Sequence, residues 1–145
     1  MHDLERIDRP IGLHEVDAIE KIMLEMPQVE LEVIHHFYNG VYARELHIPA
    51  GITLTGAIHH CENLNVLSQG EICVLVGDEM KHIKAPFAVM SPAGTKRIAT
   101  TLTDCIWTTF FSTNETDPEK IVSEFTSKTT KQYLEHCENL RIKGE

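Results

Sequence analysis

The spacing of hydrophobic residues changes once near the start of the chain, and this change separates a helix from a strand. Over residues 13–26 apolar side chains recur at steps of three and four, which predicts an amphipathic helix that ends before Pro27. From Val29 to Phe37 the period falls to two, which predicts a half-buried strand. The apolar positions of the predicted helix are Val16, Ile19, Met23 and Met26.

Short strand-like runs separated by turn signals fill the middle of the chain. Asn39-Gly40, Gln69-Gly70 and Gly77-Asp78 are pairs of residues that favour tight turns. Many short strands with regular turns between them are typical of an all-β sandwich or barrel. The expected strands after the first are 41–48, 52–59, 64–68, 71–76, 81–83, 87–91, 97–102 and 105–111.

The chain closes with a helical segment. Asp117 followed by Pro118 predicts a helix start, because Asp is a favoured N-cap and Pro is favoured in the first turn. A second helical stretch is expected after the Thr-rich break at 126–130. The sequence therefore divides into an N-terminal arm and helix (1–28), a β-barrel (29–113) and a C-terminal helical segment (114–145).

Length and charge limit the classes of partner. The chain has 145 residues, which suits one domain, and its net charge of −9 argues against a nucleic-acid duplex or an anionic membrane as a partner. It has neither a basic, apolar leader nor an apolar run of membrane-spanning length, so a cytoplasmic location is expected. Its four cysteines form no Cys-x-x-Cys pair and are expected to be free thiols.

Two stretches resemble the paired motifs of the cupin superfamily. Gly51 and Gly70 fit the frame of the first motif, and Pro92 with Gly94 fits the core of the second. The resemblance implies a single-domain, jelly-roll β-barrel (a double-stranded β-helix) with flanking N- and C-terminal helices. Over about residues 28–122 the chain is also similar to small cupins encoded by bacteriophages, which implies the host bacterial cytoplasm. It further implies a homodimer.

The resemblance also locates a metal site, and most of its ligands are replaced. Cupins usually hold a divalent metal through three histidines and a glutamate. Here those positions are filled by Ala57, His59, Asn63 and Arg97. An amide is a poor metal ligand and a guanidinium is a permanent cation, so no cofactor is expected. The replacements favour a binding protein over an enzyme.

A displaced divalent transition-metal site is the alternative. His59, His60 and Glu62 together form a 2-His-1-carboxylate set, which suits iron and related ions. Strand alternation argues against it, because neighbouring residues of a strand point to opposite faces unless a bulge intervenes.

The expected barrel interior contains a small polar pocket with one cation. An arginine inside a barrel needs a carboxylate or an anionic ligand, and its planar fork suits carboxylate or phosphate. Strand alternation predicts that Lys96 faces outward. The alternative to an anionic ligand is an ion pair inside the protein between Arg97 and an acid such as Glu45 or Glu62. The candidate ligand-binding residues are Thr55, His59, Asn63, Arg97 and Trp107, with Thr53, Ala57, Ala99 and Phe87 also expected inside.

Trp107 admits two interpretations. Core packing is the simpler one, and a stacking platform for a ring is the other, which with Arg97 would suit a nucleotide-like ligand. The function predicted first is binding of an anionic metabolite or nucleotide-like ligand. The resemblance to bacteriophage cupins implies a phage factor that acts on a host metabolite or signal. The alternatives are a metal-dependent cupin enzyme of isomerase or dioxygenase type and a non-catalytic interaction scaffold.

Overall fold

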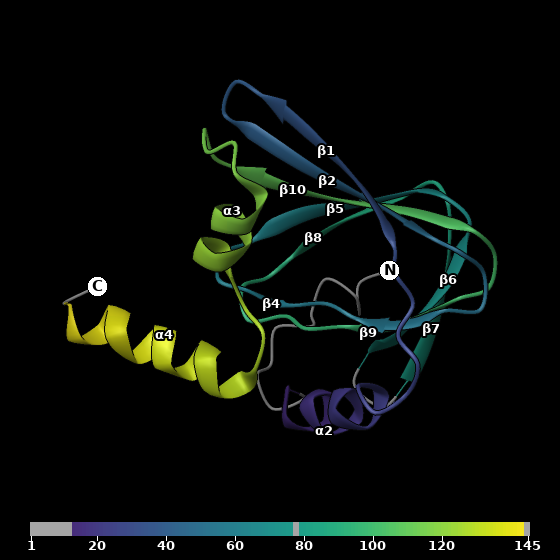
Figure 1. Cartoon of the computed structure of the whole chain (residues 1–145), viewed down its shortest axis with the longest axis horizontal. Coiled ribbons are helices and arrows are strands. Elements are labelled where there is room, and N and C mark those ends of the chain that lie inside the picture. Colours follow the sequence, from purple (N-terminus) through teal and green to yellow (C-terminus); the bar gives the residue numbers. More distant parts are fainter. Residues whose placement is uncertain (1–12, 77–78, 144–145) are drawn as a thin grey trace.

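Two antiparallel sheets face each other and form a barrel with helices around it (Figure 1). The computed structural model describes residues 13–76 and 79–143. The five-stranded sheet has the order β1 (Glu32–Tyr38), β2 (Val41–Ile48), β10 (Cys105–Ser112), β5 (Asn63–Gln69), β8 (Phe87–Ser91). The four-stranded sheet has the order β3 (Thr53–Thr55), β9 (Ile98–Thr101), β6 (Glu71–Val76), β7 (Glu79–Lys84), and β4 (Ile58–His59) pairs with β11 (Thr126–Ser127).

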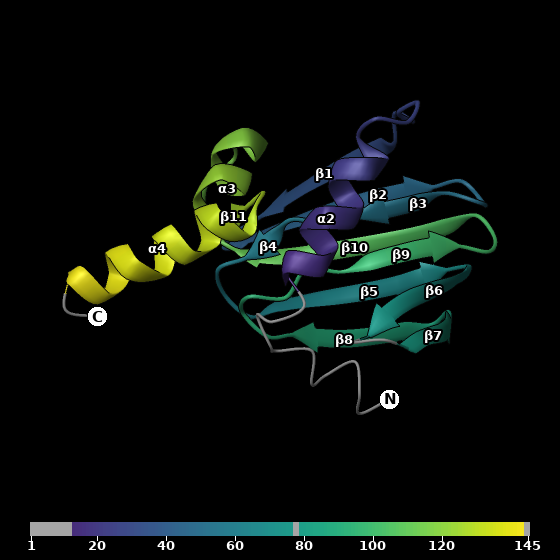
Figure 2. The same ribbon diagram turned by 90° about the horizontal axis from the view of Figure 1, so that it is seen from below.

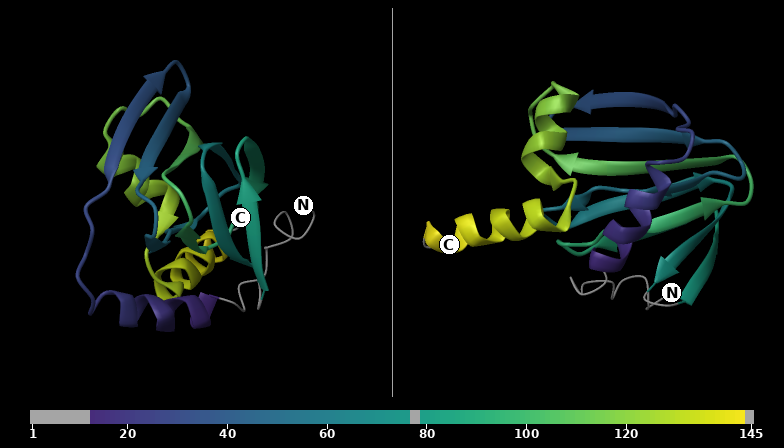
Figure 3. Two further views of the ribbon diagram at one scale, coloured as in Figure 1. Left: turned by 90° about the vertical axis from the view of Figure 1, so that its right-hand side faces the viewer. Right: turned by 60° about the horizontal axis from the view of Figure 1, so that its bottom comes forward.

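Within the described residues three helices flank the barrel: α2 (Leu13–Met23), α3 (Pro118–Phe125) and α4 (Thr130–Ile142). Figure 2 shows α2 lying across the outside of the strands, and the left panel of Figure 3 shows the segment after it running along one side up to β1. α4 extends away from the barrel (Figure 1). In the part of the chain that the structure describes, no helix is long and apolar enough to cross a membrane. The all-β barrel with flanking helices is therefore confirmed.

The strongest local signals gave the correct elements. Asp117 caps α3 by accepting a hydrogen bond from the backbone N–H of Glu119, with Pro118 in the first turn. Gly40 closes the β1–β2 hairpin at a φ of +81°, a conformation that glycine adopts without strain. All four cysteines are free, as expected. The predicted turn at 77–78 and the arm at 1–12 lie outside the described residues.

Several element boundaries differ from the sequence prediction, and the differences near the N-terminal helix and the third strand are the largest. α2 ends at Met23 instead of Met26, and β1 begins at Glu32 instead of Val29. The strand expected over 52–59 is interrupted at Gly56 and Ala57, which separate β3 from β4. Leu54 faces the interior and Thr53 is exposed, whereas Thr55 borders the cavity while its hydroxyl donates to Glu20 of α2.

The inward residues of the five-stranded sheet form two layers of different chemistry. Arg44 is opposite Thr109, and Thr109 is opposite Asn65, which makes one polar row across the sheet. Two residues further along each strand, Leu46 is opposite Trp107, which is opposite Leu67. The core cluster at this end of the barrel includes Leu67 of this row together with Ile48, Ile72, Val74, Ile83, Val89 and Cys105.

The prediction that Lys96 faces outward is wrong. Its side chain is fully buried, and its ammonium donates to Glu20 Oε1 at 2.7 Å and to the carbonyl of Lys128 at 2.8 Å, with Asp17 Oδ1 at 3.4 Å. Alternation does not apply here because residues 92–97 form a loop and β9 begins only at Ile98. Helix α2 lies over that loop and supplies both carboxylates.

Candidate functional site

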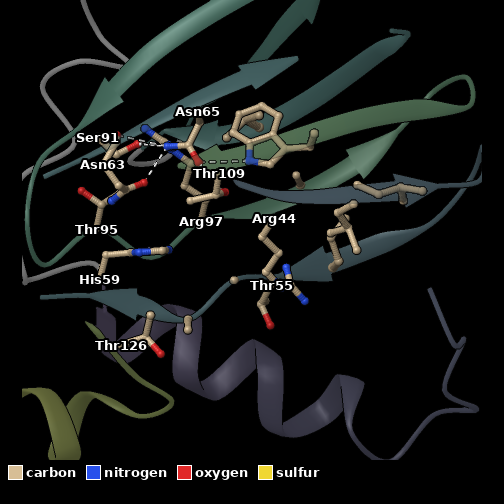
Figure 4. A pocket seen from close by; sticks show the side chains of 18 of the residues that line it. Arg44, Thr55, His59, Asn63, Asn65, Ser91, Thr95, Arg97, Thr109 and Thr126 are labelled. Atoms are coloured by element: carbon tan, nitrogen blue, oxygen red, sulfur yellow. Dashed lines mark hydrogen bonds between the residues drawn. The ribbon is translucent and has the colours of Figure 1, made fainter. Parts of the chain in front are cut away.

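A cavity of about 470 Å³ occupies the polar end of the barrel, between the two sheets (Figure 4). It is bordered by both sheets, by the loop before β9 and by the α3–β11 segment. Its lining residues are Leu31, Val33, Arg44, Leu46, Ile48, Leu54, Thr55, Gly56, Ala57, His59, Asn63, Asn65, Ile72, Val74, Ser91, Thr95, Arg97, Ala99, Trp107, Thr109, Phe111, Val122 and Thr126.

All five residues predicted to bind a ligand line this one cavity. Thr55 comes from β3, His59 from β4, Asn63 from β5, Arg97 from the loop before β9 and Trp107 from β10. Ala57 and Ala99 also line the cavity, whereas Thr53 and Phe87 do not. The four positions that the cupin resemblance assigns to metal ligands therefore converge in space, although only one of them carries an imidazole.

Arg97 is a buried cation with hydrogen-bond donors left over. Its Nε and Nη2 atoms are buried, and neither finds a hydrogen-bond partner among the described residues. These two N–H groups lie along one edge of the guanidinium and form the fork that matches two oxygens of a carboxylate or phosphate. Burial lowers the pKa of Arg97 to about 10. At neutral pH the group is charged and unpaired.

The internal partners considered for Arg97 are engaged elsewhere or are remote. Glu45 faces away from the cavity and its carboxylate contacts the rings of His36, at 2.9 Å, and His47. Glu62 is exposed beside β5. The interpretation of Arg97 as one half of an internal ion pair is therefore wrong.

A second guanidinium, that of Arg44, lines the same cavity and was missed in the sequence analysis. No ion pair or hydrogen bond of its side chain is found within residues 13–76 and 79–143. The signal was present, since alternation along β2 puts Arg44 on the same face as Leu46 and Ile48. A single charged residue on an otherwise apolar inward face indicates a site. The cavity thus contains two arginines, and no carboxylate is among its described lining residues.

His59 is neutral in this setting. Burial, followed by the positive charge of Arg97 and smaller contributions from His60 and Arg44, lowers the pKa of His59 to about 4. Its ring lies 5.6 Å from that of Phe111, measured between centroids. A neutral imidazole offers one donor and one acceptor, so His59 can hydrogen-bond a ligand without repelling it.

Asn65 organises the polar wall of the cavity and was also missed. Its amide nitrogen donates to Asn63 Oδ1 at 2.7 Å and to Ser91 Oγ at 2.9 Å. Its amide oxygen accepts from Thr109 Oγ1 at 2.7 Å and from the indole N–H of Trp107 at 3.2 Å. Figure 4 shows this wall with His59 on the other side of the cavity. The hydrogen-bonding capacity of Asn65 is therefore used within the protein.

The residues at the usual cupin metal position do not fit a metal ion. Of the four, Ala57 offers no donor atom, Asn63 is engaged by Asn65, and Arg97 adds a positive charge where a third imidazole is needed. Only His59 remains as a ligand. In the described part of the chain, no group of three or more His, Cys, Asp or Glu side chains is placed to hold a metal ion.

The displaced metal set is not brought together either. His60 faces away from the cavity, where its Nδ1 donates to the carbonyl of Glu124 at 3.0 Å and its Nε2 accepts from Ser127 Oγ at 2.7 Å. Its ring stacks on that of His136 with centroids 3.7 Å apart. His60 therefore joins the C-terminal segment to the barrel and is not among the residues that line the cavity with His59.

The comparisons with known proteins agree with this architecture. KdgF from Halomonas sp. is 18% identical with a TM-score of 0.50, over 59% of this chain and 84% of KdgF. A cupin-2 domain containing protein from Shewanella frigidimarina is 11% identical with a TM-score of 0.46, over 66% of this chain and 92% of its own. An acetylacetone dioxygenase from Acinetobacter johnsonii is 15% identical with a TM-score of 0.48, over 60% and 66%. No family model and no curated protein matches the sequence.

The likeness to KdgF, at a TM-score of 0.50, agrees with the β-barrel fold that the two sheets and the flanking helices form. At these identities the likeness concerns the fold, so the function has to be argued from the cavity itself.

Proposed function

We propose that this protein binds a small organic anion in the barrel cavity, with Arg97 as the main contact. The observation that carries the proposal is the buried, unpaired fork formed by Nε and Nη2 of Arg97. Leaving donors of a charged group unpaired in a protein interior costs more than leaving neutral ones unpaired. An anion that accepts both hydrogen bonds removes this cost, and charge-assisted pairs of this kind are among the strongest in proteins.

The remaining polar groups of the cavity support the same choice of charge. Arg44 adds a second positive charge, and no carboxylate among the described lining residues offsets either arginine. His59 is neutral because its pKa is lowered to about 4, so it can donate one hydrogen bond to the anion. A group with so low a pKa is a weak general base at neutral pH, which favours binding over catalysis.

The similarity to bacteriophage cupins suggests where such a protein would act. We place it in the bacterial cytoplasm, where it would capture or sense an anionic metabolite or signal of the host. The chemistry of the cavity supports the anionic part of this proposal.

We also propose that the protein is a homodimer. The β1–β2 hairpin at the edge of the five-stranded sheet exposes Ile34, Phe37, Tyr38 and Val41, and an exposed apolar sheet edge is a surface on which a second copy can pair. Light scattering on the eluted protein should give twice the chain mass of 16.4 kDa, and a monomer at all concentrations would exclude the dimer.

The anion proposal is tested by thermal shift with a panel of sodium carboxylates and phosphates at constant ionic strength. Ligand binding to the native state raises the melting temperature by mass action. We expect a saturable rise for at least one organic anion, its loss in Arg97→Gln, and its retention in Arg141→Gln, which changes an exposed arginine. The proposal is refuted if no member of the panel binds, or if Arg97→Gln binds as well as the wild type.

A further inference from the structure

We infer that the anion is an amphipathic monocarboxylic acid, with its carboxylate at Arg97 and an apolar body that lies along the barrel axis beside Trp107. This inference rests on the proposed function and adds the class of ligand. It follows from the change of chemistry along the strands, from a polar layer to an apolar one.

The five-stranded sheet supplies one side of this gradient. Its polar row contains Arg44 and Asn65, and the next row along the strands contains Leu46 and Trp107, which also line the cavity. Each step of two residues advances about 6.6 Å along a strand, roughly the length of a five- or six-carbon chain. A ligand held by its carboxylate in the first row therefore extends into the second.

The opposite sheet has the same gradient. Arg97 lies just before β9, and two residues later Ala99 is paired with Leu54 on one side and with Val74 on the other. These three side chains line the cavity and carry no polar atom. The two sheets therefore agree on which end of the cavity is charged and which is apolar.

The polar side chains around Asn65 offer a ligand no further hydrogen bonds, because they bond to one another. Asn65 uses its oxygen and its nitrogen inside the protein, and the indole N–H of Trp107 is used by Asn65. Trp107 therefore offers the ligand only carbon surface. Among the described lining residues, the second row offers a ligand group no free hydrogen-bonding partner.

This arrangement disfavours the more polar anions. A nucleotide or sugar phosphate would carry hydroxyl or base groups into the second row, and burying them without partners is unfavourable. A cavity of about 470 Å³ is also at the smaller end of small-molecule sites. A hydrocarbon or aryl carboxylate fits both the charge and the apolar layer.

The test is a titration with a series of linear carboxylates, followed through Trp107, which is the single tryptophan of the chain and lines the cavity. Butanoate, hexanoate and octanoate differ only in the length of the apolar body. Each buried methylene contributes about 0.8 kcal/mol, so affinity should rise about fourfold per methylene until the cavity is filled. The neutral octanamide and the nucleotide AMP are the comparison probes.

Two variants locate the body of the ligand. Ala99→Leu fills the apolar row and should lower the affinity for octanoate at least tenfold, while the affinity for butanoate should stay within threefold of the wild-type value. Leu54→Ala enlarges the same row and should move the best chain length upward, which keeps the test decisive if Ala99→Leu fails to fold. Arg97→Gln should remove binding of the whole series.

The outcomes separate the inference from the proposed function. Equal affinity for butanoate and octanoate, with both lost in Arg97→Gln, would overturn the apolar body and leave anion binding in place. AMP binding more tightly than octanoate would overturn the inference in favour of a nucleotide-like ligand. Octanamide binding as tightly as octanoate, or no loss in Arg97→Gln, would overturn the proposed function itself.

Discussion

Replacing Lys96 with methionine should destabilise the protein strongly, although the sequence pattern placed this residue on the surface. The ammonium of Lys96 is fully buried between Glu20, Asp17 and the carbonyl of Lys128. Methionine keeps most of the apolar stem and removes the charge. Glu20 and Asp17 would then lie next to each other without their shared cation.

The size of the effect follows from burial. Removing one partner of a buried ion pair costs about 3–5 kcal/mol. The side chains of Asp17 and Glu20 are 28% and 24% exposed and keep some contact with water, so we expect the lower end, about 3 kcal/mol. For a chain of this length that loss corresponds to a drop of roughly 10 °C in melting temperature.

Urea unfolding measured by circular dichroism gives the free energy of unfolding. Lys84→Met is the matched control, because that side chain is 76% exposed, lies 3.9 Å from Glu71 and should change stability by less than about 0.5 kcal/mol. Adding Glu20→Gln to Lys96→Met should recover part of the loss, because it removes an uncompensated carboxylate. A loss below about 1 kcal/mol in Lys96→Met would refute the assignment of Lys96 as the residue that holds α2 to the barrel.

Three further changes test the cavity and the frame around it. Arg97→Met should raise the free energy of unfolding by about 1–3 kcal/mol in urea titrations, because it removes a buried charge with unpaired donors, and an unchanged or lower value would show that those donors are satisfied. The pKa of His59 is about 4 in the folded protein and 6.5 when unperturbed, so between these pH values the unfolded chain binds the extra proton. The free energy of unfolding should therefore fall as the pH is lowered from about 6.5 to about 4, by up to about 1.4 kcal/mol per pH unit. His59→Gln should flatten this slope, and an equal slope in both proteins would contradict the reasoning. Gly70→Ala should lower the free energy of unfolding by at least about 2 kcal/mol in the same urea assay, because φ is +96° and a Cβ would collide with the carbonyl of Asp104. The control Gly40→Ala has a φ of +81° but open space around the Cβ, and should cost about 1 kcal/mol. Equal costs would show that the collision at Gly70 is relieved.

Residue alternation predicted the interior well where strands are continuous. Along β5 and β10 it turns Asn63 and Trp107 inward, whereas the places of His59 and Arg97, which lie outside continuous strands, came from the cupin motif frame; the structure brings all four to one cavity. The same rule contained the signal for Arg44, which went unused. Alternation works because every strand of a barrel turns one of its two faces to the interior, whichever strands it pairs with.

The rule failed where the position of a side chain depends on a distant segment. Lys96 is buried because α2, about 80 residues earlier in the chain, covers the loop before β9 and supplies two carboxylates. Thr53 is outside because β3 pairs with β9 with Leu54 facing inward, and the break at Gly56 restarts the alternation before His59. The hydrogen-bond partners of Asn65 come from its own strand and from two others, β8 and β10, so its role follows only from the assembled sheet.

The cost of keeping Arg97 buried can be compared directly with what a ligand contributes. If the unpaired guanidinium lowers stability by about 1–3 kcal/mol, a ligand at a hundred times its dissociation constant restores about 2.7 kcal/mol to the native state. The wild type with ligand at a hundred times its dissociation constant and Arg97→Met without ligand should therefore have similar melting temperatures. If the ligand-bound wild type remains clearly below the variant, the burial of Arg97 is not offset by the anion, and the reason for its position in the barrel must be sought in another contact.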